Sequence, residues 1–246
     1  MDIRPPYGYQ DVVPLIKEHR VALRAERKIP SGFRNLNALP LSFTEFTVAC
    51  RDYPIAFVGA NTGSVIAMAV LGLERQQNLF ATAEDDWDAS VYLPAYVRRH
   101  PFCMTRVTVD GKERAERVAC VEKGALSDSG EPLFDAKGEP LPAWDARRKL
   151  LFEFEADLVR SEEMSRELGR HQLLESFSLQ AQPNQGPPLA MTGMYRVSEQ
   201  KLAERAPNEL MALLQKGILA RVYAHLISLA NFGRLLDRRA KQSQSA

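Results

Sequence analysis

The stretch FCMTRVTVDGKERAERVACV, residues 102–121, decides the fold class of this chain. At its centre lies Asp110-Gly111, a dipeptide typical of two-residue hairpin turns. The segments on either side, 102–109 and 114–121, are rich in β-branched and apolar residues. The stretch therefore predicts two antiparallel strands joined by a tight turn.

Further strand signals lie upstream of this hairpin. Residues 55–58 and 64–71 are apolar and are separated by the turn residues Asn61-Thr62-Gly63, and 78–81 is a short apolar run. Five strands between 54 and 121, mostly joined by short loops, predict one antiparallel sheet. Alternating residues over 175–196, interrupted at 183–188, predict a second hairpin.

Helical periodicity dominates elsewhere. Apolar residues trace one stripe over 144–170, and spacings of three and four over 209–239 predict a long amphipathic helix. Short helices are expected at 43–52 and 93–99. We therefore expect an α+β fold, in which the antiparallel sheet is covered by a central helix and a long C-terminal amphipathic helix. The core should include Leu214, Ile218, Val222 and Leu229.

Three regions differ in composition. Residues 1–40 contain seven basic and four acidic residues and predict a basic arm packed on the body. Residues 41–240 predict a single α+β domain. Residues 241–246 are small and polar and predict a disordered tail.

Composition excludes several function classes. The 246 residues carry 32 basic and 31 acidic side chains, so no overall charge attracts nucleic acid or an anionic membrane. Three cysteines without a CxxC pair predict neither a disulfide framework nor a thiolate zinc site. No apolar run approaches the roughly 20 residues of a membrane span, and residues 1–10 lack the apolar core of a secretory signal. We expect a cytoplasmic protein without direct membrane insertion.

Motifs of known chemistry are missing from the sequence. It contains no phosphate-binding loop, no GxGxxG, no GxSxG and no HExxH, and no histidine is followed two residues later by an acid. We therefore predict no catalytic residue, no cofactor and no metal. His225 lies on an apolar helix face, which suits either a core histidine or a ligand contact, and His19 lies in the basic arm.

The segment 87–102 mixes aromatic residues with arginines. Such residues dominate the energetics of protein interfaces, so the segment predicts a surface that contacts a protein or peptide. Alternatively, its aromatics pack in the core and its arginines pair with the acids of 84–88. Tyr195, His19 and His225, from other segments, are added as candidates. The full set of candidate partner- or ligand-binding residues is Trp87, Tyr92, Tyr96, Arg98, Arg99, Tyr195, His19 and His225.

A series of short motifs follows in order along most of the chain: Pro14–Leu23 with His19, Phe43–Phe46, Tyr53–Phe57, Tyr92–Phe102, Gly130–Phe134, Gly193–Val197 and His225–Leu229. In this order they resemble the SapC family of bacterial proteins. His100 stands where a tyrosine is more usual before Pro101. The resemblance implies a soluble protein associated by name with surface-layer assembly or export. It also implies gene neighbours that encode outer-membrane receptors, halogenase-like proteins and cupin-like proteins.

These observations favour a non-enzymatic accessory protein that binds a protein or peptide partner in bacterial surface-layer or outer-membrane assembly or transport. The alternative is a small-ligand- or metal-binding enzyme that acts with an oxidative tailoring system. We expect no nucleic-acid partner, and the sequence leaves homo-oligomerisation open.

Overall fold

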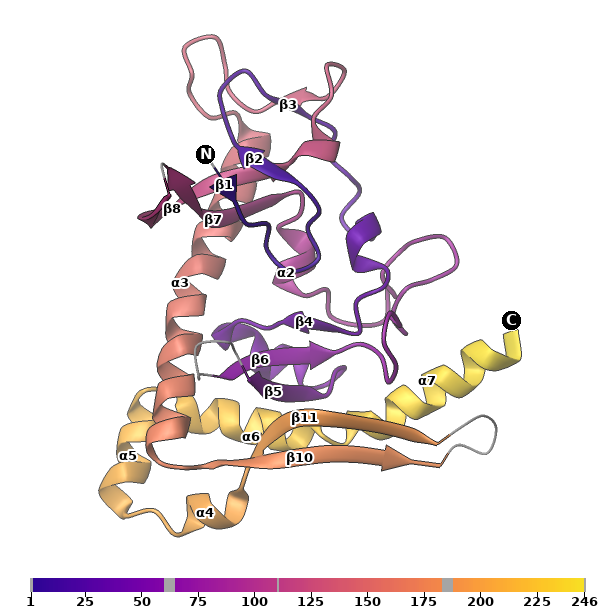
Figure 1. Ribbon diagram of the computed structural model, residues 1–246, viewed down its shortest axis with the longest axis vertical. Helices are drawn as coiled ribbons and strands as arrows, with labels where there is room; N and C mark the ends of the chain where they lie inside the picture. The colour runs from indigo at the N-terminus through magenta and orange to yellow at the C-terminus, as the bar shows by residue number, and fades with distance from the viewer. Residues whose placement is uncertain (1, 60–64, 110, 183–187, 246) are drawn as a thin grey trace.

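Among the residues that the structure describes, two larger antiparallel sheets form the framework, together with seven α-helices (Figure 1). The computed structural model describes residues 2–59, 65–109, 111–182 and 188–245. The predicted α+β class is confirmed. The expectation of one sheet over 54–121 is wrong, because the strands of this region divide between the two sheets.

The first sheet contains the hairpin that decides the fold. Its strand order is β1-β7-β8-β2, with β7 and β8 antiparallel as predicted. Asp110 of the predicted turn lies outside the described residues. The basic arm supplies the two outer strands, so its residues are part of this sheet. The bounds are β1 Asp2–Ile3, β2 Val12–Pro14, β7 Phe102–Val109 and β8 Lys112–Glu122.

The second sheet has the order β10-β11-β5-β6-β4 and joins segments far apart in sequence. The predicted hairpin over 175–196 is present as β10 and β11, and β11 pairs with β5. The predicted turn at 61–63 and residues 183–187 of the turn predicted at 183–188 lie outside the described residues. The bounds are β4 Ala38–Pro40, β5 Ile55–Gly59, β6 Val65–Val70, β10 Leu174–Ala181 and β11 Leu189–Val197.

The strand predicted at 78–81 does not form. Asn78 Oδ1 accepts a hydrogen bond from the Phe80 N–H at 3.0 Å, which bends the backbone into a local turn. Ala81 makes only an isolated bridge with Trp87. The local side-chain bond therefore prevails over the apolar pattern at this position.

The long helix α3 (Pro142–Arg170) matches the helix predicted at 144–170. Its buried stripe includes Trp144, Leu151, Phe154 and Leu168. α3 contacts β7 of the first sheet and β6 of the second, and runs along the side of both sheets (Figure 1). The helix therefore ties the two sheets together.

The C-terminal region contains three helices where one was predicted. Gly217 adopts a φ of 69° between α5 (Pro207–Gln215) and α6 (Ile218–Ser228), and α7 (Asn231–Ser245) follows. α5 and α6 meet at 89°. Because of this break, Leu214 is 54 % exposed and the prediction that it is buried is wrong. Ile218 and Val222 are buried, as expected.

Leu229, which was expected in the core, is half-buried at the end of α6. α7 includes residues 241–245, for which the sequence predicted a disordered tail. In the described part of the chain, no single helix is long and apolar enough to cross a membrane; α5 and α6 pass that test only together, despite the bend between them.

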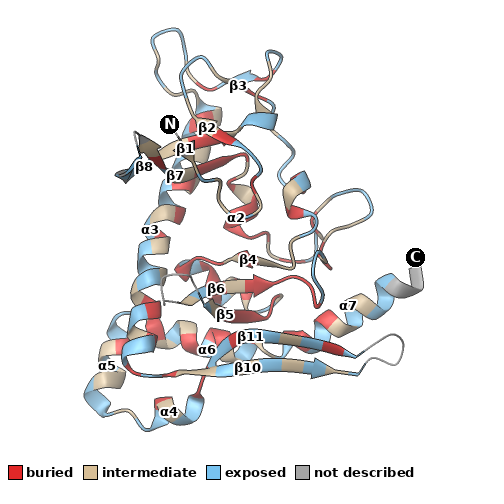
Figure 2. Cartoon of the chain, in the orientation of Figure 1, coloured by how far each residue is buried: buried red, intermediate tan, exposed pale blue. Residues whose placement is uncertain are grey.

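The remaining elements are short. β3 and β9 form a separate two-stranded sheet, and the helix predicted at 43–52 is a 3-10 turn, η2, continued by α1. Buried residues gather in β5 and β6 and along one side of α3 (Figure 2). The bounds are β3 Arg20–Val21, β9 Glu131–Pro132, η1 Ser31–Phe33, η2 Phe43–Glu45, η3 Lys123–Ala125, α1 Phe46–Ala49, α2 Ala95–Arg98 and α4 Glu199–Ala203.

Candidate functional site

A pocket of about 140 Å³ lies where η2, α2 and α3 meet. It joins two segments that the sequence marked separately, 43–46 and 92–102, and adds the middle of α3. Its lining residues are Ser42, Thr44, Glu45, Val48, Tyr92, Ala95, Arg98, Leu150, Glu153, Phe154 and Asp157.

Glu45 forms the inner wall of the pocket and is 4 % exposed. One carboxylate oxygen accepts hydrogen bonds from the Ser42 N–H at 3.0 Å and the Ser42 hydroxyl at 2.7 Å. The other accepts from the Ala95 N–H at 2.6 Å and the Tyr92 hydroxyl at 3.0 Å. A residue that caps η2 therefore also holds the first residue of α2 in place.

Asp157 brings α3 to the same point. Its Oδ2 accepts from the Thr44 N–H at 3.1 Å and from the Thr44 hydroxyl, and it lies 3.3 Å from the Ser42 hydroxyl. Arg160 approaches the second oxygen, Oδ1, at 3.4 Å. The buried carboxylates of Glu45 and Asp157 thus have their acceptor capacity largely filled by the protein itself.

Arg98 and Tyr92 line the pocket and are both half-buried. Arg98 Nη2 donates to the Tyr92 hydroxyl at 3.1 Å, and that hydroxyl donates on to Glu45. Burial and the nearby Glu45 carboxylate raise the pKa of Tyr92 well above its usual value, so the phenol remains protonated. Arg98 Nε is buried and has no hydrogen-bond partner among the described residues.

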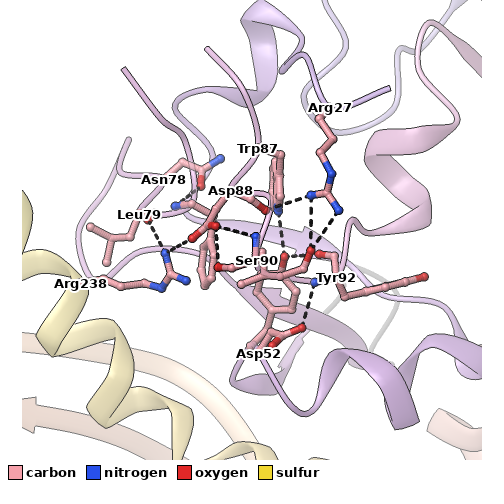
Figure 3. A network of polar contacts seen from close by, with 12 residues as sticks. Arg27, Asp52, Asn78, Leu79, Trp87, Asp88, Ser90, Tyr92 and Arg238 are labelled. Atoms are coloured by element: carbon pink, nitrogen blue, oxygen red, sulfur yellow. Dashed lines mark hydrogen bonds and ion pairs between the residues drawn. The ribbon is translucent and has the colours of Figure 1, made fainter. Parts of the chain in front are cut away.

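The loop before α2 is fixed by a polar network on its other side (Figure 3). The Tyr92 N–H donates to Asp52 Oδ2 at 2.9 Å, and the Tyr92 carbonyl accepts from the Tyr53 hydroxyl. Trp87 Nε1 in turn donates to the Tyr53 hydroxyl at 2.8 Å. Arg238 of α7 pairs with Asp88 at 2.7 Å. These hydrogen bonds fix the position of Tyr92 at the pocket.

The structure divides the predicted aromatic and arginine residues into two groups. Tyr92 and Arg98 line the pocket. Trp87, Tyr96 and Arg99 are at most 4 % exposed and belong to the core, as the alternative interpretation of this segment expected of the aromatics. The acids of 84–88 do not pair with the arginines of α2. Their side-chain partners among the described residues are Lys28, Arg34, Ser90 and Arg238.

Arg99 is enclosed by aromatic rings. Its guanidinium carbon lies 4.1 Å from the ring centroid of Tyr96 and 4.5 Å from that of Phe154. Its Nη1 lies 3.6 Å from Glu155 of α3. Arg99 therefore serves to join α2 to α3 and does not face the pocket.

The other three candidates lie away from the pocket. Tyr195 is 38 % exposed on β11, where it pairs with Phe57 of β5. His19 is half-buried in the arm and its Nδ1 accepts the Ile16 N–H at 3.4 Å. His225 is fully buried in α6. The structure therefore does not bring His19, Tyr195 or His225 into a common site with Tyr92 and Arg98.

His225 has both ring nitrogens bonded to backbone. Nδ1 donates to the Ile55 carbonyl at 2.8 Å, and Nε2 accepts the Val197 N–H at 3.1 Å. This pattern requires the neutral ring with its proton on Nδ1. Burial lowers the pKa of His225 to about 4. The histidine ties α6 to β5 and β11 and is a core residue.

We expect the stability of the protein to fall as the pH is lowered from 6.5 to 4. Unfolding restores an ordinary histidine pKa, so in this window the unfolded chain binds a proton that the folded chain resists. The stabilisation is complete above pH 6.5, and about 3 kcal/mol is lost by pH 4.

Urea unfolding at pH 7.0, 6.0 and 5.0 measures this loss, with His225→Gln as the control that cannot titrate. Carboxylates whose pKa is lowered in the folded protein, such as Glu122, also lose stabilisation as the pH falls toward 4, so the difference between the parent and His225→Gln at each pH is the quantity that reports the histidine. A parent protein whose stability changes with pH no more than that of His225→Gln would contradict the assignment.

The three acidic residues of the pocket are absent from the candidates named from the sequence: Glu45, Glu153 and Asp157. Glu45 lies three residues after Ser42, a spacing that indicates a helix start and not a pocket. Asp157 lies three residues after Phe154 on the buried stripe of α3, and an acid at such a position is the signal that could have revealed it. Across the described ranges, no group of three or more histidine, cysteine, aspartate or glutamate side chains could hold a metal ion.

Comparison with known proteins gives one match. The SapC family model matches residues 17–235, which is nearly the whole chain and includes every residue of the pocket. No curated protein and no solved structure matches the chain. The chain belongs to the SapC family.

Proposed function

We propose that this protein is a non-enzymatic accessory protein that binds a protein or peptide partner through the pocket between η2, α2 and α3. One observation carries the proposal: Arg98 Nε is a buried donor at the pocket with no partner among the described residues. An arginine left in this way is suited to bind an acceptor group of another molecule.

The setting that we propose is surface-layer or outer-membrane assembly or transport in bacteria, with the protein acting from the cytoplasm. It is supported by membership of the SapC family and by the resemblance described above. The enzyme alternative draws on the gene neighbours that the resemblance implies and on His19 and His225. Both ring nitrogens of His225 are bonded to backbone groups, so this histidine does not support that alternative.

Arg98→Met should weaken binding to the true partner by about 1–3 kcal/mol while leaving the melting temperature nearly unchanged. Methionine keeps an apolar stem of similar length but removes all five N–H donors. The measurement is binding of the purified products of adjacent genes to the immobilised protein, beginning with the receptor- and cupin-like proteins.

Arg148→Met is the matched control, because Arg148 is an exposed arginine of α3 that pairs with Asp145 and does not line the pocket. Equal binding of each captured gene product by the parent and by Arg98→Met would refute the proposal.

A further inference from the structure

The polar side chains of the pocket differ in how many hydrogen-bond partners they have within the protein. Each carboxylate oxygen of Glu45 already accepts two hydrogen bonds, and Asp157 Oδ2 accepts from Thr44. Within the part of the chain that the structure describes, one of the five N–H donors of Arg98 is engaged, at Nη2 by Tyr92. Glu153, which is exposed at the rim, forms no hydrogen bond or ion pair with the rest of the described chain. The pocket therefore offers one cationic group and one anionic group to a ligand.

The free donors of Arg98 define the first part of that ligand. A guanidinium presents its N–H groups in a planar fork that matches the two oxygens of a carboxylate. Arg98 Nε is buried, so a carboxylate placed against it would satisfy a donor that the protein leaves unpaired.

The three carboxylates at the pocket define the second part. Glu45, Glu153 and Asp157 disfavour a dianion such as phosphate. They tolerate a singly charged group more readily, and Glu153 can accept an N–H that lies next to that group. A peptide C-terminus has a carboxylate with its own backbone N–H close by.

The apolar lining defines the third part. Val48, Leu150 and Phe154 lie around the same pocket as Arg98. They can contact the side chain of the last residue of a peptide, and an apolar side chain would gain most from that contact. The volume of about 140 Å³ suits one residue and not a folded segment.

We propose that this pocket binds the C-terminal carboxylate of a peptide whose last residue is apolar, with Arg98 holding the carboxylate and Glu153 accepting the adjacent backbone N–H. The inference rests on the proposed function and names the chemical feature of the partner that would enter the site. An internal Asp or Glu side chain shares the carboxylate chemistry but lacks a backbone N–H at the same spacing.

The test uses three labelled, N-acetylated hexapeptides and fluorescence anisotropy with the full chain. The first peptide ends in leucine with a free carboxylate, the second is its C-terminal amide, and the third is the amide with an internal aspartate. We expect the free acid to bind at least tenfold more tightly than either amide, and Arg98→Met to abolish that difference. Glu153→Gln should weaken binding of the free-acid peptide a few-fold, whereas Arg148→Met should bind this peptide as tightly as the parent does.

Equal binding of the free acid and its amide, stronger binding of the internal-aspartate peptide, or a preference for the free acid that survives Arg98→Met would each overturn the inference. No binding of free-acid peptides ending in leucine, phenylalanine or alanine at millimolar protein would also overturn it. If the peptides fail but a neighbouring gene product still requires Arg98 for capture, the proposed function stands and only the C-terminal recognition is wrong.

Discussion

Arg99→Ala should lower the free energy of unfolding by about 3 kcal/mol, chiefly because it truncates a large buried side chain, since Glu155 keeps its ion pair with Arg117. The side chain of Arg99 is 3 % exposed and faces Glu155, which is 14 % exposed. The substitution also removes the planar group that lies against the rings of Tyr96 and Phe154 and leaves a cavity between α2 and α3. Denaturant unfolding of the parent and the variant measures the loss.

The neighbouring residue supplies a matched control. Arg98→Ala removes the same side chain one position earlier, where it is half-buried at the pocket, and should change stability by less than about 1 kcal/mol. Arg99→Lys should recover only part of the loss, because an ammonium cannot stack between two rings as a guanidinium does. Similar stabilities for Arg98→Ala and Arg99→Ala would show that the two arginines do not have the separate roles assigned to them.

This pair of arginines shows where inference from the sequence ends. The pattern of aromatics and arginines in 87–102 is the same for both residues, and spacing on a four-residue helix could not tell which arginine would be buried. The outcome depends on α3, which lies about fifty residues later and supplies both Phe154 and Glu155. Both arginines were therefore named as binding candidates, and only the structure separates Arg98 at the pocket from the buried Arg99.

Some parts of the fold likewise follow from local sequence, whereas others depend on contacts between distant segments. The β7–β8 hairpin and α3 follow from local turn chemistry and periodicity, and both were predicted. The division into two sheets was missed, because β5 pairs with β11 and β7 pairs with β1, partners more than 90 residues away in sequence. The break at Gly217 was also missed, since its left-handed backbone interrupts a regular apolar pattern without changing it.

Glu45→Ala is the second substitution from which we expect a large effect, about 3–4 kcal/mol of lost stability. Four donors lose their acceptor at once: the N–H and hydroxyl of Ser42, the Ala95 N–H and the Tyr92 hydroxyl. Each buried donor left unpaired costs about 1–3 kcal/mol, and water entering from the pocket would recover part of that sum. Thermal and urea unfolding measure the effect.

Two further variants separate the role of this carboxylate from a general loss of charge at the pocket. Glu45→Gln keeps one acceptor oxygen and turns an NH₂ group toward the other pair of donors, so it should lose about half as much stability as the alanine variant. Glu153→Ala removes an exposed carboxylate from the same pocket and should change stability by no more than about 0.5 kcal/mol. The loss of stability should decrease in the order Glu45→Ala, Glu45→Gln, Glu153→Ala, because this is the order of the number of acceptors removed from buried donors. Equal losses at both positions would mean that stability depends only on the net charge of the pocket.

Because Glu45 holds both the N–H of Ala95 and the hydroxyl of Tyr92, its loss should also displace α2 and Arg98. Glu45→Ala should therefore bind the partner less well than its remaining folded fraction alone would predict.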